Sequence, residues 1–417
     1  MKVVLAAYEN ISSSQKHGFG FLSYRLVLAL HKAGLLESVV CLDCDPDLEI
    51  PGASIHRFSE HWPGRIGRRI ISALSRVLPG FDRRLAEERL FDRFVASHLG
   101  TNAENLLLCS RPLFALSVRA AREMGMAVWV QASIPHPQTN YSLVRNEELR
   151  LNLPSRGPYS DPNRTKRLAG VIARADKLIC PAEEIARYAY RDYVKHLGEE
   201  RILPLHKFFV SDAGAFADIA AARTSDELND GITFLHVSHM NLIKGIPYLL
   251  EAWRLFKQGG HGKGCRLLLV GATDSNTDEL IARDFSDLPD MEATGYVEDI
   301  RPHMASGDVF ISPSISDCGP GTIAEAMGAG MPVISSQNCG SASLISDGVS
   351  GYTYPFNDPE GLCQILRTIA ENPTRIREMG QAARSAMSGV SMGDYADEIV
   401  DAIRARQGQA PESPKIT

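Results

Sequence analysis

SPSISDCGPGTIAEAMGAGMPVISS, residues 312–336, is the stretch that decides the fold we expect for this chain. One apolar run ends just before it at Ile311, and a second begins inside it at Val333. Between the two runs lie a turn rich in glycine and a short segment, residues 323–327, whose apolar residues have helical spacing. Apolar strands that alternate with helices are typical of parallel sheets in α/β proteins. The stretch therefore predicts a strand, a tight turn, a short helix and a second strand.

The turn predicts a site for an anion. A proline near the start of a helix lacks only an N–H group that no helical carbonyl would accept. The other N–H groups of a first turn point outward from the positive end of the helix dipole, where an anion is stabilised. We therefore expect the turn to border a phosphate group of a ligand; its residues are Gly319, Pro320, Gly321 and Thr322.

Two carboxylates, Asp317 and Glu325, stand eight residues apart around this turn. Since an acid repels an anion, neither is suited to binding the phosphate itself. Each is better suited to accepting hydrogen bonds from hydroxyl groups, and a ribose and a sugar both offer pairs of these. The spacing allows a second interpretation with equal weight, in which Glu325 only caps its helix or forms a salt bridge on it.

An acid, seven residues and Glu325, followed by Ala326-Met327 and the run GMPVI at residues 330–334, resembles the signature of the retaining family-4 glycosyltransferases, the group 1 glycosyl transferases of GT-B fold. The resemblance implies an α/β protein with two Rossmann-like, doubly wound domains that face a central cleft. It implies that Glu325 holds the donor ribose, that the turn holds the diphosphate and that Asp317 holds the transferred sugar. The family has Glu where this chain has Asp317.

The resemblance implies further donor contacts in the second half of the chain. Lys244 is expected to clamp the diphosphate, and His239 stands where the family has the second clamp residue, an Arg. Tyr296 and Val297 are expected to border the nucleotide base. For Lys244 and His239 the alternative is an ordinary solvated side chain.

In the N-terminal half, Gly18 and Gly20 follow an apolar run at residues 3–7 and precede an apolar-periodic segment. The third glycine of a dinucleotide-binding fingerprint would fall at Ser23, which argues against NAD. The resemblance implies that the two glycines face the cleft. The alternative is a loop that closes onto its own helix.

His136 follows a second apolar run, at residues 127–130. Open α/β sheets bind ligands at the carboxyl edge of their strands. The resemblance implies that His136 faces the sugar, and ordering of its own loop is the alternative. The polar segment 140–168 is expected to shape the acceptor side.

Residues 62–78 predict a basic amphipathic helix, with apolar residues from Trp62 to Leu78 on one side and arginines on the rest. Such a helix can lie on an anionic membrane. A helix that packs on its own domain with a solvated polar face is the alternative.

The length of 417 residues predicts two domains, 1–216 and 217–390, with a last helix at about 391–406 that packs back on the first domain and a disordered tail at 407–417. The 44 Lys and Arg and 50 Asp and Glu residues give a net charge of −6, so nothing favours a nucleic-acid partner. The eight cysteines are scattered, which suits reduced thiols. We expect a cytoplasmic protein that can contact the inner face of the membrane.

Two short patterns, Cys41-x-x-Cys44 and Asp43-Cys-Asp45, occur in metal sites, but each stands alone and we expect no metal. The resemblance implies a retaining, metal-independent transfer of a sugar from a UDP- or GDP-linked donor to a glycan or lipid-linked acceptor. The departures at His239 and Asp317 leave open a non-catalytic homologue that serves as a partner subunit or binds glycans. A sugar-nucleotide epimerase of the same fold is a third interpretation.

Overall fold

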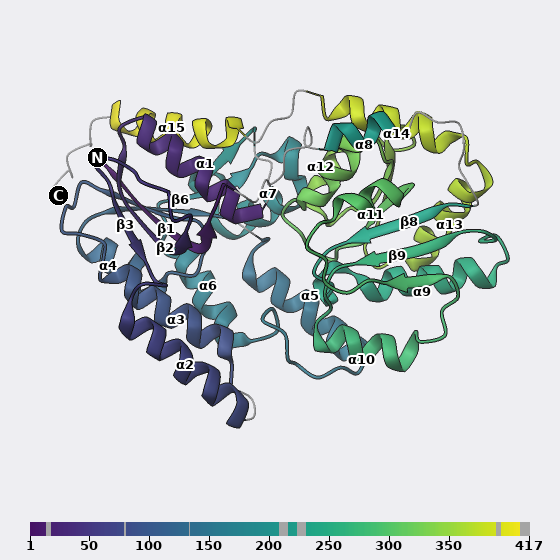
Figure 1. Ribbon diagram of the computed structural model, residues 1–417, viewed down its shortest axis with the longest axis horizontal. Helices are drawn as coiled ribbons and strands as arrows, with labels where there is room; N and C mark the ends of the chain where they lie inside the picture. Colours follow the sequence, from purple (N-terminus) through teal and green to yellow (C-terminus); the bar gives the residue numbers. More distant parts are fainter. Residues whose placement is uncertain are drawn as a thin grey trace. The chain divides into compact units, whose positions relative to one another are not determined.

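The structure is a computed structural model that describes residues 1–13, 18–78, 81–132, 134–207, 216–222, 231–388 and 393–408. It contains two parallel β-sheets flanked by helices (Figure 1). The strands of the first sheet are β1 (Val3–Ile11), β2 (Leu36–Cys44), β3 (Ser54–Arg57), β4 (Leu106–Cys109), β5 (Ala127–Gln131), β6 (Lys177–Pro181) and β7 (Ile202–Leu205). Those of the second are β8 (Thr233–Val237), β9 (Arg266–Val270), β10 (Met291–Ala293), β11 (Val309–Ser312), β12 (Val333–Ser336) and β13 (Gly351–Tyr354).

The helices of the first half are α1 (Gly18–Lys32), α2 (Trp62–Val77), α3 (Arg83–Ala96), α4 (Ala115–Glu123), α5 (Pro137–Arg150), α6 (Pro162–Arg174), α7 (Glu183–Leu197), the 3-10 turn η1 (Glu199–Arg201) and α8 (Ala217–Ala222). Those of the second half are η3 (Leu242–Lys244), α9 (Ile246–Gln258), α10 (Ser275–Asp284), α11 (Arg301–Ser306), α12 (Gly321–Gly328), η4 (Gly340–Leu344), α13 (Pro359–Glu371), α14 (Arg375–Ala386) and α15 (Gly393–Gly408). Within these described residues, no helix combines the length and the apolar character needed to cross a bilayer.

Both sheets have the strand order of a doubly wound fold. The first runs β3-β2-β1-β4-β5-β6-β7, and the second runs β10-β9-β8-β11-β12-β13. In each sheet the order reverses once, between β1 and β4 and between β8 and β11. Ligands of such folds bind at this reversal, beyond the carboxyl ends of the strands. The predicted α/β class with two Rossmann-like sheets is confirmed.

The central strand β8 of the second sheet is buried on both faces, as its apolar run predicts. Phe234 belongs to the core on one face with Trp253 of α9, and its neighbour Leu235 belongs to the core on the other face with Met327 of α12. Successive residues of a strand point to opposite faces, so neither face of β8 is exposed to solvent. This burial fixes the position in which the loops after β8 and β11 leave the sheet.

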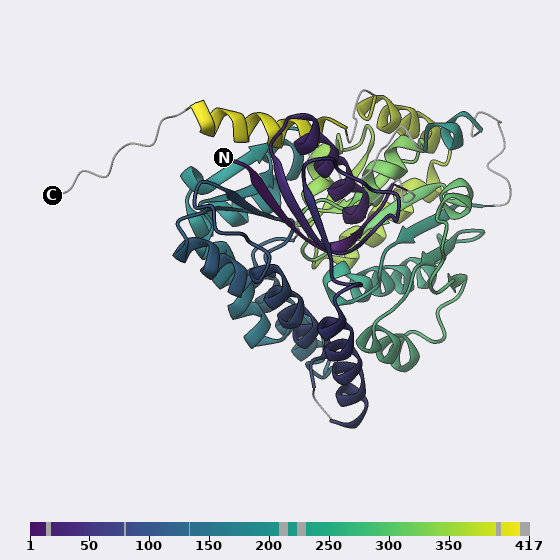
Figure 2. The ribbon, with the colours of Figure 1, turned by 60° about the vertical axis from the view of Figure 1, so that its left-hand side comes forward.

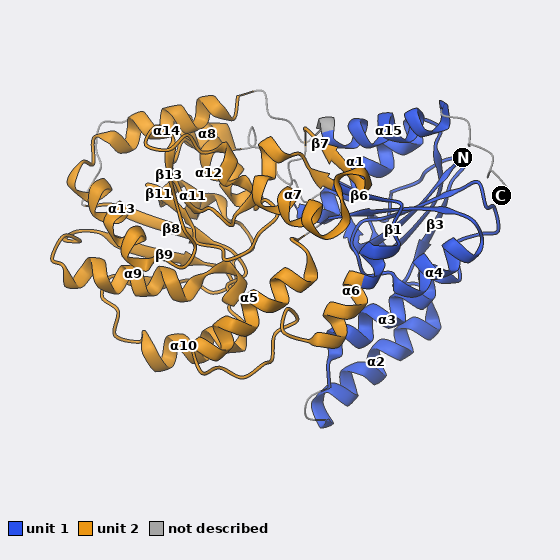
Figure 3. Cartoon of the chain, turned by 180° about the vertical axis from the view of Figure 1, so that it is seen from behind, with its two compact units in different colours: residues 1–132, 170–179, 392–417 blue, residues 133–169, 180–391 orange. Residues whose placement is uncertain are grey.

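Contacts divide the chain into two compact units, residues 1–132, 170–179 and 392–417 and residues 133–169 and 180–391 (Figure 3). We keep 1–216 and 217–390 as the proposed domains, since each range holds one complete sheet. In the first unit α15 contacts α1, and Tyr395 donates a hydrogen bond to Gln131 Oε1 at 2.5 Å.

Three element boundaries differ from the sequence prediction. Helix α1 begins at Gly18, so both glycines of the turn belong to it. Strand β10 ends at Ala293, whereas the sequence predicts a strand from Met291 to Val297. Helix α15 extends to Gly408, so the prediction of a disordered tail is wrong for residues 407 and 408, and residues 409–417 lie outside the described residues. The polar run at 223–230, which the sequence predicts as the linker between the two domains, also lies outside them.

Candidate functional site

The loops after β8 and β11 meet at the reversal point of the second sheet. Ile315 N–H donates a hydrogen bond to Ile243 O at 2.9 Å, which joins the two loops through their backbones. Gly245 has φ +71°, and a Cβ atom there would lie 1.8 Å from Pro313 O. A side chain at residue 245 would therefore push the loops apart, which explains why glycine follows Lys244.

This junction brings Lys244 and Asp317 together, although 73 residues separate them in the chain. Lys244 Nζ lies 2.5 Å from Asp317 Oδ2, and the two side chains are 26% and 12% exposed. Burial lowers the pKa of Lys244, but the charge of Asp317 and the hydrogen bond to it raise that pKa by more, so it is raised overall. Lys244 is therefore a permanent cation at this site.

The second oxygen of Asp317 is also engaged, since Oδ1 accepts a hydrogen bond from Gly319 N–H at 3.1 Å. The backbone of Asp317 pairs with a neighbouring segment through Asn338 O at 3.1 Å and Gly340 N–H at 2.9 Å. Lys244 and the Gly319 N–H, two donors predicted to hold phosphate, thus converge on one anionic group. A carboxylate of the protein itself occupies the position for which we expected a ligand anion.

Helix α12 begins directly after this turn. Pro320 is its N-cap residue with extended backbone (φ −64°, ψ 127°), and Gly321 and Thr322 form the first turn. Glu325 lies inside the helix and is only 4% exposed. Burial excludes a solvated position on the helix surface for this carboxylate.

A residue that the sequence analysis missed, His236, supports the loop after β8. The side chain is 2% exposed, with Nδ1 2.8 Å from Ile311 O and Nε2 2.7 Å from Ser238 Oγ. Burial is the main cause that lowers the pKa of His236 to about 4, and the charge of Lys244 adds to this effect. The hydrogen bond to Ile311 O raises the pKa but does not offset the burial. Because a carbonyl only accepts, the neutral ring keeps its proton on Nδ1 and accepts from Ser238 through Nε2. The sequence feature that could have identified His236 is the presence of a histidine inside an apolar strand.

The remaining predicted residues of the second half differ in exposure. His239 is exposed, and we find no hydrogen bond or ion pair to its side chain from the described part of the chain. Tyr296 is 78% exposed, whereas Val297 packs against the core that contains Met327. Their contacts with a phosphate or a base stay predictions.

In the first half, Gly20 allows α1 to approach β1, because a Cβ atom there would lie 2.4 Å from Asn10 O. Gly18 has φ +78° and begins α1. These observations support the interpretation in which the turn closes onto its own helix. The cleft-facing role of both glycines stays a prediction.

His136 caps α5, where its Nδ1 accepts from Gln138 N–H at 3.3 Å. The backbone N–H of His136 donates a hydrogen bond to Asp192 Oδ2 at 2.7 Å. The imidazole ring of His136 stacks on the ring of His196, with centroids 3.8 Å apart. Burial, with a further effect of His196, lowers the pKa of His136 to about 4. The ring is 5% exposed, so the structure assigns it an ordering role, and contact with a sugar stays a prediction.

The two short patterns considered for metal binding have other partners. Cys44 Sγ accepts a hydrogen bond from Arg57 Nε at 2.9 Å, and Asp45 Oδ2 accepts one from Ser13 N–H at 2.7 Å. Across the described ranges, no three His, Cys, Asp or Glu side chains form a group that could hold a metal ion.

Comparison with known proteins gives a family match in the same half of the chain. The family model described as Glycosyl transferases group 1 matches residues 231–372. The amylovoran biosynthesis glycosyltransferase AmsK of Erwinia amylovora is 28% identical over 192 residues, which are 44% of this chain and 46% of that protein. The colanic acid biosynthesis glycosyltransferase WcaL of Escherichia coli, a putative assignment, is 25% identical over 178 residues, 41% of this chain and 44% of that protein. The chain thus covers less than half the length of each relative.

Solved structures match over nearly the whole chain. HepE of Anabaena, crystallised with UDP and glucose, has a TM-score of 0.63 at 15% identity and covers 97% of this chain and 100% of that one. The lipopolysaccharide glycosyltransferase WaaG has a TM-score of 0.63 at 15% identity, with coverages of 96% and 99%. At these identities the likeness shows the fold, which is that of GT-B glycosyltransferases. The chain therefore has the GT-B fold, and its residues 231–372 match the family model of the group 1 glycosyl transferases.

Proposed function

We propose that the protein is a retaining glycosyltransferase that moves a hexose from a UDP- or GDP-linked donor to a glycan or lipid-linked acceptor. The observation that carries this proposal is the convergence of Lys244 Nζ and the Gly319 N–H on one anionic group. That group lies at the reversal point of the group 1 domain, where doubly wound sheets bind nucleotides. The UDP and glucose named with the HepE structure support a nucleotide-sugar donor.

In the proposed reaction, the donor diphosphate replaces the Asp317 carboxylate between Lys244 and the turn before α12. The bond from the anomeric carbon to the diphosphate oxygen breaks, and the acceptor oxygen bonds to that carbon on the same face. The acceptor proton passes to the departing phosphate oxygen. Lys244 and the backbone N–H groups stabilise the charge that develops on the leaving group. Asp317, released from Lys244, accepts hydrogen bonds from the sugar, and the buried Glu325 accepts them from the ribose.

We propose that no metal takes part, because a lysine and oriented N–H groups supply the positive charge that a diphosphate requires. We also propose a role in the synthesis of a surface polysaccharide or glycolipid in the cytoplasm. The names of AmsK and WcaL, which refer to amylovoran and colanic acid, support this role.

We further propose that α2 rests on the anionic inner face of a membrane. One side of α2 packs on α3 at one end of the first unit, where a Cβ atom at Gly67 would lie 2.7 Å from Leu90 and where Ile71 is buried (Figures 1 and 2). Large apolar side chains nevertheless stay exposed on α2, with Trp62 at 71% and Val77 at 75%. Exposed arginines accompany them at positions 65, 68, 69 and 76. Exposed apolar and cationic side chains on one helix suit an anionic lipid surface.

A non-catalytic homologue that binds glycans or serves as a partner subunit is the second candidate. Two observations favour it: the exposed His239 replaces the expected Arg, and Asp317 itself occupies the clamp. A proton NMR assay with UDP- and GDP-linked hexoses separates the candidates. A retaining transferase slowly releases the sugar with the donor's anomeric configuration, whereas no release from any donor supports the non-catalytic homologue. Release with inversion contradicts the proposed mechanism.

A further inference from the structure

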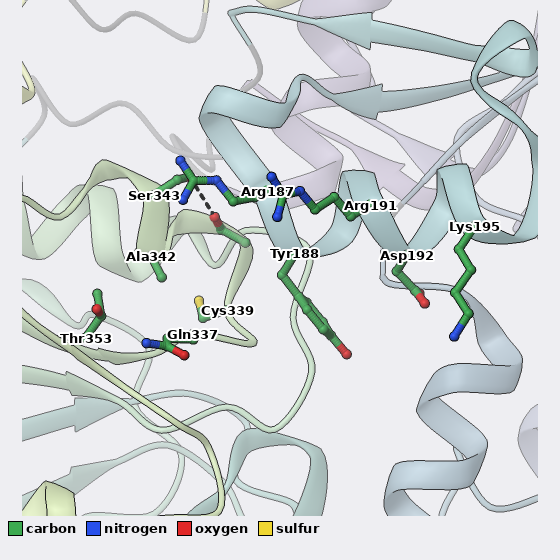
Figure 4. A pocket seen from close by; sticks show the side chains of 11 residues that line it. Arg187, Tyr188, Arg191, Asp192, Lys195, Gln337, Cys339, Ala342, Ser343 and Thr353 are labelled. Carbon is green, nitrogen blue, oxygen red and sulfur yellow. Dashed lines mark hydrogen bonds between the residues drawn. The ribbon is translucent and has the colours of Figure 1, made fainter.

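A cavity of about 500 Å³ lies within the second unit, between helix α7 and the segment around η4 (Figure 4). Its size falls in the range of small-molecule sites, which is roughly 300–1,000 Å³. None of the residues singled out in the sequence lines it. The lining side chains come from α7 (Arg187, Tyr188, Arg191, Asp192 and Lys195), from the segment after β12 (Gln337, Cys339, Gly340, Ala342 and Ser343) and from β13 (Thr353).

One wall of this cavity is basic. Arg187, Arg191 and Lys195 follow one another at intervals of four residues, which places them on one side of α7, as Figure 4 shows. Arg191 pairs with Glu183 at 2.7 Å. Among the described residues, no carboxylate lies within ion-pair distance of Arg187 or Lys195.

The acid in the lining, Asp192, carries one negative charge, against the two positive charges of Arg187 and Lys195. Asp192 Oδ2 accepts from the His136 N–H at 2.7 Å, and Oδ1 accepts from Thr139 Oγ1 at 2.7 Å. The Asp192 side chain is 9% exposed. The cavity therefore presents a surplus of positive charge to a ligand.

The opposite wall is joined to the candidate donor site. Gly340 N–H donates to Asp317 O at 2.9 Å, and Cys339 is the bridge partner of Asp317. From the basic wall, Tyr188 Oη donates to Ser316 Oγ at 3.3 Å. The lining residues Cys339 and Gly340 are thus backbone neighbours of Asp317, whose carboxylate we assign to the transferred sugar.

Polar groups for a sugar are also present. Gln337 and Thr353 line the cavity with an amide and a hydroxyl group. Ser343 Oγ donates to Ile185 O at 2.7 Å, which leaves its lone pairs available to accept hydrogen bonds. Hydroxyl-binding groups and unpaired cations on facing walls suit a sugar that carries a negative charge.

We propose that this cavity is the acceptor subsite and that it selects a sugar bearing an anionic group, either a phosphate or a carboxylate. The inference rests on the proposed function and adds the chemical class of the acceptor. Arg187 and Lys195 contact the anionic group, and the segment after β12 contacts the hydroxyl groups. The acceptor hydroxyl then faces the anomeric carbon held beside Asp317.

The test uses the full chain saturated with UDP, so that the diphosphate clamp is occupied and cannot bind the probe. Glucose 6-phosphate, glucuronate and glucose are titrated by calorimetry against wild type, Lys195→Glu and Lys263→Glu. Lys263 is an exposed cation of the same unit outside the cavity, so it gives a matched control. UDP titration of each variant reports whether it is folded.

We expect at least one charged sugar to bind wild type about tenfold or more tightly than glucose, since a charge-assisted contact contributes on that scale. The tighter of the two probes identifies the anionic group as phosphate or carboxylate. Lys195→Glu should remove the preference and keep the UDP affinity, while Lys263→Glu should keep both. Charged sugars that bind no better than glucose, or that respond equally to the two substitutions, overturn the inference. If wild type does not bind UDP or GDP, the proposed function itself fails.

Discussion

Asp317 accepts hydrogen bonds from Lys244 Nζ and the Gly319 N–H, the two groups that the proposed reaction assigns to the diphosphate. Asp317 is therefore a competitor of the nucleotide-sugar as well as a ligand of the transferred sugar. Asp317→Asn removes the charge and keeps a side-chain oxygen for Gly319. We expect UDP alone to bind about fivefold more tightly, because a repulsive charge at a partly exposed site contributes about 1 kcal/mol. Turnover should fall, since the sugar loses its carboxylate partner. Calorimetry and single-turnover kinetics measure the two effects, and weaker UDP binding would contradict this role.

His236 makes the stability of the second sheet depend on pH. Its pKa is lowered to about 4 by burial, so the unfolded chain binds the proton more strongly than the folded chain. The unfolding free energy should therefore fall as pH drops from about 6.5 to about 4, by up to about 1.4 kcal/mol per pH unit. His236→Gln removes this contribution. Urea unfolding at several pH values should show a shallower slope for the variant, and equal slopes would be inconsistent with a buried neutral histidine.

The loop from β8 to α9 shows why the family resemblance could indicate Lys244 without explaining Gly245. A Cβ atom at Gly245 would meet Pro313 O, which belongs to a different loop. Gly260 is the matched control, because its φ of +74° is similar and a Cβ atom there would have no neighbour within 4 Å. Gly245→Ala should lower the unfolding free energy by about 1–3 kcal/mol more than Gly260→Ala and should weaken UDP binding. Equal losses in denaturant unfolding would show that the contact does not hold the loop.

Helix α2 gives a prediction that salt can test. Binding to vesicles rich in anionic lipid should weaken steeply as salt rises, because each arginine contributes about 1 kcal/mol near the surface. Arg68→Glu with Arg69→Glu should reduce binding at least tenfold. Arg404→Glu with Arg406→Glu, two exposed positions on α15, should not. The proposal fails if neutral and anionic vesicles bind equally or if both double variants lose the same affinity.

Strands were predictable from sequence where both faces are buried. The apolar runs at 233–237 and 266–270 coincide with β8 and β9, because such strands need no polar side. Helices α5 and α6 were not predicted, since their segment is polar and carries no clear apolar period. Pro137 after the capping His136 was the available signal for the first of them.

At the scale of the whole molecule, the alternation of strands and helices predicted two Rossmann-like sheets, and their strand orders place the reversal points where ligands bind. The turn at 319–322 and the two acids were identified because they belong to one strong local pattern, whereas Lys244 was identified only through the family resemblance. The pairing of Lys244 with Asp317 and the cavity beside α7 could not be read from the chain. Both arise from contacts between segments far apart in the sequence, for which local spacing carries no information.

The most direct test of the account is the affinity for UDP and GDP of wild type, Lys244→Ala and Glu325→Gln, measured by calorimetry. Wild type should bind one of the nucleotides. Lys244→Ala should weaken that binding by about 1.5–3 kcal/mol, the contribution of a charge-assisted contact to phosphate, and Glu325→Gln by about 1–3 kcal/mol through lost ribose contacts. Thermal unfolding of each variant controls for its fold. Absence of binding to both nucleotides in wild type, or unchanged affinity in folded Lys244→Ala, would contradict the claim that these loops form a nucleotide-sugar site.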